Sequence, residues 1–95
     1  MSGGENVAPL EVEQALLAHP AVVDAGVAGV PDPEWGEAVT AFVVLAEPVD
    51  LDELRAWARE RLEPFKVPKS IHAVDSLPRN RGGKVLRDRL AERAP

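Results

Sequence analysis

Cysteine is missing from this 95-residue sequence, and its absence excludes disulfide bonds and thiolate chemistry. Aromatic residues are scarce, with two tryptophans, two phenylalanines and no tyrosine, so a stacking platform for nucleic acid is not expected. No apolar run approaches the ~18 residues of a membrane span, and the first residues lack the pattern of a signal peptide. The histidines, His19 and His72, lie far apart, so no zinc site is expected. Neither is expected to have a serine or cysteine close by to activate, so no hydrolase triad is expected either. These absences favour a small cytoplasmic domain without a metal site.

The charges are divided unevenly along the chain. The net charge is −5, yet every lysine and arginine lies between Arg55 and Arg93, while residues 1–54 carry acids and no base. Five bases fall within residues 79–89, close to a glycine pair. Such a segment indicates an anion site, although charge alone favours the alternative of a solvated basic tail.

The spacing of apolar residues, prolines and glycines predicts an α+β fold in a single domain. A short hairpin or extended segment should precede the first helix, and residues 22–30 and 39–45 should form strands that pair antiparallel. We expect a small antiparallel sheet of about three strands, with helices covering one face. The remaining predicted elements are helices over residues 9–19, 51–62 and 85–93 and a strand over residues 71–74.

Lys84 is the first candidate for chemistry. It follows Gly82 and Gly83, which permit close backbone approach to a ligand, and it lies at the predicted start of a helix. A long ammonium side chain there could neutralise charge on a phosphoryl or carboxyl oxygen; the alternative is an ordinary surface lysine. Trp35, in a proline-rich loop, could cover a ligand ring or fill the edge of the core, whereas Trp57 lies inside a helix and is expected to be structural.

Four segments, in order, resemble the C-terminal domain of the acyl-adenylate-forming enzymes, in the acyl-CoA synthetase branch. Residues 78–87 (PRNRGGKVLR) are similar to the family signature P-[RK]-[TN]-x-x-G-K-[VI]-x-[RK]. Residues 2–13 (SGGENVAPLEVE) resemble the entry to that domain, and residues 30–37 (VPDPEWGE) and 65–69 (FKVPK) resemble two of its internal motifs. The resemblance covers nearly the whole chain.

The resemblance implies an enzyme that joins a carboxylic acid to AMP from ATP and then transfers the acyl group to coenzyme A (CoA). Lys84 matches the lysine that reaches into a large N-terminal domain and bridges the acyl carboxylate and the α-phosphate. The C-terminal domain then rotates, withdrawing this lysine and presenting another face for thioester formation. The same loop resembles a target of protein lysine acetyltransferases and deacetylases, which are therefore expected partners at Lys84.

The resemblance also implies contacts with CoA. Gly3 and Gly4 match the segment that lines the pantetheine passage, and Trp35, Phe65 and Lys69 match positions at the nucleotide end of CoA. Val67 departs from the pattern, since some members carry a base there, and this weakens the case for a phosphate contact at that position.

The family's large ATP- and acid-binding domain is not contained in these residues, so the 95 residues alone should be inactive. ATP and CoA are the expected substrates, with Mg²⁺ bound through the N-terminal domain, and fatty acid metabolism is one expected setting. Two alternatives remain: a stand-alone CoA-binding or regulatory module acting with a partner in trans, and a basic-tail interaction domain with an inert Lys84.

Overall fold

The computed structural model describes residues 8–34 and 36–94, and these form three α-helices and one three-stranded sheet. The α+β class is therefore confirmed, while the hairpin or extended segment expected at the start of the chain lies outside the described residues. In chain order the elements are α1 (Pro9–Leu17), β1 (Val22–Asp32), β2 (Gly36–Leu45), α2 (Leu51–Arg61), the 3₁₀ helix η1 (Pro64–Lys66), β3 (Ser70–Ala73) and α3 (Arg87–Ala91).

The first residues of α1 and α2 explain where these two helices begin. Pro9 occupies the first turn of α1, where its fixed φ suits the helix and its missing N–H costs no hydrogen bond. Asp50 caps α2, since its Oδ1 accepts a hydrogen bond from the Asp52 backbone N–H at 2.9 Å. None of the described helices is long and apolar enough to cross a membrane.

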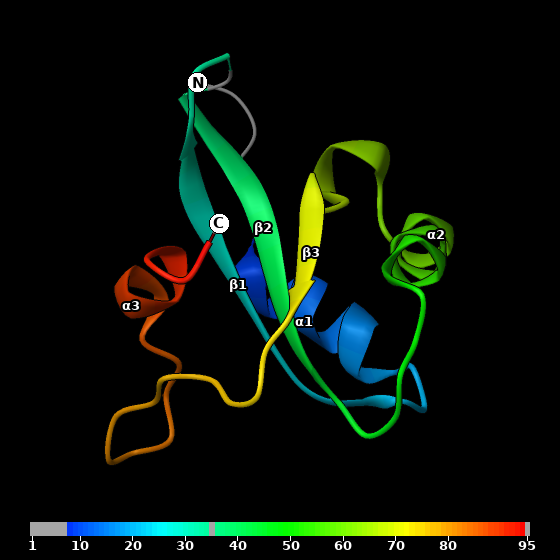
Figure 1. The fold of residues 1–95 in the computed structure, drawn as a ribbon. Helices are drawn as coiled ribbons and strands as arrows, with labels where there is room; N and C mark the ends of the chain where they lie inside the picture. The colour runs from blue at the N-terminus through cyan, green and yellow to red at the C-terminus, as the bar shows by residue number, and fades with distance from the viewer. Residues whose placement is uncertain (1–7, 35, 95) are drawn as a thin grey trace.

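The sheet is mixed, with strand order β1-β2-β3. β1 and β2 pair antiparallel, as expected, with Val27 opposite Ala41, but β3 pairs parallel to β2, with Ile71 opposite Ala41. The expectation of an antiparallel sheet was therefore wrong for the third strand. Its physical reason is the crossover through α2, which carries the chain back to the end of the sheet where β2 begins, so β3 runs in the same direction (Figure 1).

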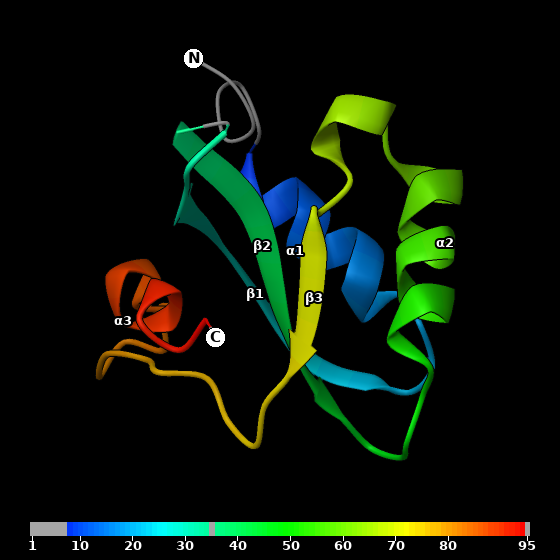
Figure 2. The same cartoon turned by 45° about the horizontal axis from the view of Figure 1, so that its top comes forward.

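Helices cover both faces of this sheet, not one face as expected. α1 and α2 pack on one face, around a core that includes Leu16, Val43 and Leu54, while α3 lies on the other (Figure 2). There Leu90 packs with Phe42 and Leu77 in a second, smaller core. The unbroken apolar run of β2 reflects this arrangement, because a strand buried on both faces does not alternate between apolar and polar residues.

Candidate functional site

Lys84 lies on a tight hairpin loop. The Asn80 backbone N–H donates to the Lys84 carbonyl at 2.9 Å, and the Lys84 N–H donates back to the Asn80 side-chain oxygen at 3.0 Å. Gly83 has φ of +86°, a left-handed conformation that closes the turn and that glycine adopts without strain. The expectation that Lys84 begins a helix was wrong, because an isolated bridge between Arg79 and Val85 closes the loop and α3 begins only at Arg87.

Arg79 fixes the first stem of this hairpin. Its Nη1 donates to the Gly83 carbonyl at 2.5 Å, and its Nη2 donates to Asp24 of β1 at 2.6 Å. The hydrogen bond that Arg79 donates to Asp24 raises the pKa of Arg79 above its usual value, so the guanidinium stays charged. One side chain thus joins the turn to the edge of the sheet.

Arg87 fixes the second stem to the same edge strand. Its Nη1 donates to the carboxylate of Glu13, on α1, and to the Val27 carbonyl at 3.0 Å. The same Glu13 carboxylate accepts from the Val27 N–H at 2.9 Å. Since β1 is an edge strand, its outward N–H and C=O at Val27 would otherwise lack partners in the sheet. The ion pair satisfies both groups and holds α1, β1 and the hairpin together.

The sequence did not reveal Glu13 or Arg79 as part of the site. Glu13, an acid near the start of the first helix, is what the positive end of a helix favours, but its side chain is only 7% exposed and accepts a hydrogen bond from β1. The available signal was its place beside Val12 and three residues before Leu16, on the buried side of α1. An acid on that side needs a buried cation or donor.

The Lys84 side chain is exposed at one end of the molecule, beside an open pocket of about 650 Å³. The pocket is lined by Asn80, Lys84, Val85, Leu86, Arg87, Asp88 and Arg89. Arg79 and Arg87 are engaged in ion pairs, whereas Arg81, Lys84 and Arg89 form none with another described residue. The anion site expected on the basic segment stays a prediction; of these three cations, Lys84 and Arg89 line the pocket and Arg81 does not.

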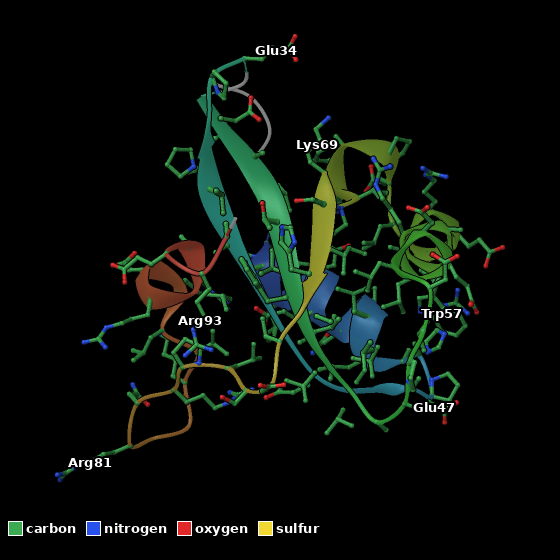
Figure 3. All side chains as sticks on the ribbon, in the orientation of Figure 1. Glu34, Glu47, Trp57, Lys69, Arg81 and Arg93 are labelled. Carbon is green, nitrogen blue, oxygen red and sulfur yellow. The ribbon has the colours of Figure 1, made fainter. Side chains whose placement is uncertain are left out.

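Phe65 and Lys69 lie at the other end. Phe65, in η1, is 54% exposed, and the Lys66 Nζ lies over its ring, 5.5 Å from the centroid. Lys69 precedes β3, and its backbone N–H donates to the Val39 carbonyl at 2.8 Å. Its side chain borders two pockets, one toward α2 and one toward Pro31 and Asp32. In Figure 3, Lys69 lies far from Arg81, which marks the tip of the hairpin that carries Lys84.

Lys66 fixes η1 to α1 at this second end. Its Nζ lies 3.0 Å from Glu11 and 3.1 Å from Glu63, and these hydrogen bonds raise the pKa of Lys66. The segment that carries the exposed ring of Phe65 is therefore anchored to α1. Val67, the residue after η1, is buried in the larger core, which agrees with its lack of charge.

Three of the predicted site residues, Gly3, Gly4 and Trp35, lie outside the described residues. Trp57 is structural, as expected: its Nε1 donates to the Ala15 carbonyl at 2.9 Å, and so joins α2 to α1. Of the described candidates, Phe65 and Lys69 share one end of the fold, and Lys84 lies at the other.

The expectation that neither histidine has a serine close by was wrong for His72. Ser70 Oγ lies 3.4 Å from His72 Nε2, because residues two apart on a strand share a face. His19 is buried and packs edge-on against Trp57. Among residues 8–34 and 36–94, no cluster of three or more histidine and acidic side chains could hold a metal ion.

Comparison with known proteins gives a consistent result. The sequence profile described as AMP-binding enzyme C-terminal domain matches residues 11–84. A 2-succinylbenzoate–CoA ligase of Bacillus velezensis is 54% identical over 97% of this chain and 19% of its own length. A feruloyl-CoA synthase of an Amycolatopsis species is 48% identical over 98% of this chain and 19% of its own.

A solved structure agrees with the fold. The o-succinylbenzoate CoA synthetase of Bacillus subtilis, in complex with its acyl-adenylate intermediate, matches with a TM-score of 0.87 and 48% identity, over 95% of this chain and 19% of that one. The 95 residues thus span about a fifth of the length of each of these relatives, which are full-length acid–CoA ligases.

Proposed function

Because the chain belongs to the AMP-binding enzyme C-terminal domain family, we propose that it is the mobile C-terminal domain of an AMP-forming acyl-CoA ligase. The complete reaction converts a carboxylic acid, ATP and CoA to acyl-CoA, AMP and pyrophosphate. The large domain that binds ATP with Mg²⁺ and the acid is a partner in this proposal, joined in cis or supplied in trans, and the expected cytoplasmic location stays a prediction.

The observation that carries the proposal is the separation of the two sets of candidate residues. Lys84 lies on a hairpin at one end of the sheet, and Phe65 and Lys69 lie at the other. Both ends cannot face one reaction centre in one orientation. A domain that rotates between two half-reactions would use each end in turn, which supports adenylation at the Lys84 end and thioester formation at the Phe65 end.

Lys84 is the proposed catalytic residue of adenylation. Attack of the carboxylate on the α-phosphorus moves negative charge onto the phosphoryl oxygens and brings two anions together. An ammonium held on a rigid turn stabilises that charge. The rigidity comes from the hydrogen bond that Asn80 accepts from the Lys84 N–H and from those that Arg79 and Arg87 donate. The lysine contributes charge and position and transfers no proton.

The Phe65 end is proposed to bind CoA in the second half-reaction. The exposed ring of Phe65 is suited to stacking on an adenine, and the Lys69 ammonium is suited to a phosphate. Gly3, Gly4 and Trp35 complete the proposed CoA passage, with the glycines leaving room for the pantetheine chain.

We assign no particular carboxylic acid as the substrate. The relatives are named for 2-succinylbenzoate and ferulate, so fatty acid metabolism is narrower than the comparisons support. The family resemblance places acid recognition in the large domain, and we propose only a carboxylic acid substrate.

The test uses a full-length ligase carrying this domain. Lys84→Ala should reduce acid-dependent ATP–pyrophosphate exchange about 100- to 1000-fold, while thioester formation from supplied acyl-adenylate continues. Arg81→Ala is the matched control, because it removes a cation from the same turn without an ion pair to another described residue. Equal losses in both half-reactions for Lys84→Ala would contradict the assignment.

The exposed Lys84 is also proposed as a site of regulatory acetylation. Acetylation removes the positive charge, so it should stop adenylation and spare the thioester step. Mass spectrometry of the ligase from cells in several growth states should find this lysine acetylated in at least one; its absence from all would contradict the proposal.

A further inference from the structure

The peptide group between Gly83 and Lys84 is held at both of its polar atoms. The Gly83 carbonyl accepts a hydrogen bond from Arg79 Nη1 at 2.5 Å. The Lys84 N–H donates to Asn80 Oδ1 at 3.0 Å. Because a peptide group is planar, it cannot turn without breaking both of these bonds. The two bonds therefore set the direction in which the Lys84 side chain leaves the backbone.

Arg79 is itself held from outside the hairpin. Its Nη2 donates to Asp24 Oδ1 at 2.6 Å, and Asp24 lies 55 residues earlier in the sequence, on β1. A guanidinium is rigid and planar, so fixing one of its terminal nitrogens also fixes the other. One side chain thus connects the peptide before Lys84 to the sheet.

The Asp24 carboxylate is fixed by the backbone of its own strand. Its Oδ1 also accepts a hydrogen bond from the Ala25 N–H at 3.0 Å. The register of β1 on β2 shifts between Val22 and Asp24, and such an irregularity redirects the side chains beside it. The connection from the sheet to Lys84 therefore consists of a strand, a carboxylate, a guanidinium and a peptide group, each held by the one before it.

The Asp24–Arg79 pair adds little to stability. The two side chains are 29% and 37% exposed, and an ion pair open to water contributes little to the free energy of unfolding. The hairpin is already joined to β1 by Arg87, which donates to the Val27 carbonyl and to the buried Glu13. What the exposed pair adds is a defined place for one peptide group.

We propose that Asp24 is a positioning residue for adenylation, because it acts through Arg79 to hold the peptide before Lys84 in one orientation. This role rests on the proposed function of Lys84 and adds to it a residue of β1 outside the signature segment 78–87. Neither Asp24 nor Arg79 touches substrate. A displacement of a catalytic group by about 1 Å can lower a rate ~100-fold, so a small shift of Lys84 is enough to be measured.

The test uses a full-length ligase that carries this domain, with each half-reaction measured separately. Asp24→Ala should lower the kcat of acid-dependent ATP–pyrophosphate exchange about tenfold. Thioester formation from supplied acyl-adenylate should stay within about twofold of the parent, because Lys84 takes no part in that step. A residue that served stability alone would not separate the two half-reactions in this way.

Asp75→Ala is the matched control. It removes the same charge from the exposed segment before the hairpin, and Asp75 makes no hydrogen bond or ion pair with another described residue. Both half-reactions of this variant should stay within about twofold of the parent. A loss of adenylation equal to that of Asp24→Ala would overturn the proposal, since it would show an effect of charge alone.

A double-mutant cycle tests the route through Arg79. Arg79→Ala should lower the rate of adenylation at least as much as Asp24→Ala does. The variant that carries both changes should be no slower than Arg79→Ala, because Asp24 has nothing to hold once Arg79 is gone. Two independent losses that multiply would overturn the route.

Hydrogen–deuterium exchange of the same ligase follows the hairpin without turnover. In Asp24→Ala, peptides covering residues 80–86 should take up deuterium faster than in the parent, because the Lys84 N–H is less well protected. Unaltered uptake, an unaltered rate of adenylation, or equal losses in both half-reactions would overturn the proposal. Lys84→Ala is measured beside these variants. If it lowers adenylation and Asp24→Ala does not, only the role of Asp24 fails; if neither does, the proposed function fails as well.

Discussion

At the scale of single residues, the two glycines before Lys84 have different reasons to be glycine. Gly83 has φ of +86°, while Gly82 shows no positive φ and a Cβ there would only approach Asn80 Oδ1 at 3.4 Å. Backbone conformation, not space, sets the requirement at Gly83, since nothing lies within 4 Å of a Cβ there. The turn that presents Lys84 therefore depends on one of the pair.

Gly83→Ala should destabilise the domain by about 1–2 kcal/mol, because a side chain strains the left-handed conformation. Gly82→Ala, next to it, should change the free energy of unfolding by less than about 0.5 kcal/mol. Urea denaturation of both variants measures the difference. Equal effects would mean that the turn does not hold Gly83 in the left-handed conformation.

The sequence predicted the glycine-containing loop before Lys84, because composition alone marks such loops, but it placed the helix start at Lys84 rather than at Arg87. It did not predict the partners of the loop. Asp24 and Glu13 lie more than 50 residues before the arginines that bind them, and such pairing depends on the tertiary fold. The sequence therefore predicted a basic segment, but not which of its arginines form ion pairs with distant acids.

At the scale of elements, the Glu13–Arg87 pair replaces the strand neighbour that β1 lacks at Val27. Arg87→Ala should cost about 2–4 kcal/mol, because it leaves the carboxylate buried without its cation; partial exposure of Arg87 keeps the cost below that of a fully buried pair. Arg89→Ala on the same helix should cost less than about 0.5 kcal/mol. Similar urea midpoints for the two variants would contradict this role.

The anchor of η1 on α1 should depend on pH. The pKa of Lys66 is raised above 10.5 by its hydrogen bonds with Glu11 and Glu63, so its contribution to stability is present below the unfolded pKa of about 10.4 and is lost as the pH rises through the folded value. Lys66→Gln should therefore lower the free energy of unfolding at pH 9. The difference between parent and variant should shrink toward zero at the highest pH at which the chain folds. A constant difference between parent and variant across that range would show that the ammonium charge is not the cause.

Most elements were predictable from sequence because their signals are local. Pro9 and Asp50 mark two helix starts, and the β-branched run of β2 marks a central strand. The direction of β3 and the position of α3 were not predictable in this way. They depend on which sheet edge and which face stay open after α1 and α2 have packed, and this is decided by packing of the whole domain.

At the scale of the whole molecule, the sheet separates two ends that carry candidate site residues, with the Lys84 hairpin at one and η1 with Lys69 at the other (Figure 3). The chain spans about a fifth of its relatives, so these ends are expected to work against a much larger partner. An antibody against the domain should detect a polypeptide several times larger than 10.2 kDa in the source cells. A band near 10.2 kDa would instead indicate action in trans.

The most direct test of the account compares Lys84→Ala with Lys69→Ala in a full-length ligase that carries this domain, measuring each half-reaction separately. Lys84→Ala should abolish most ATP–pyrophosphate exchange and spare thioester formation from supplied acyl-adenylate. Lys69→Ala should do the reverse, raising the KM for CoA while leaving the exchange reaction intact. If both variants impair the same half-reaction, the two ends do not serve separate steps, and the central claim is contradicted.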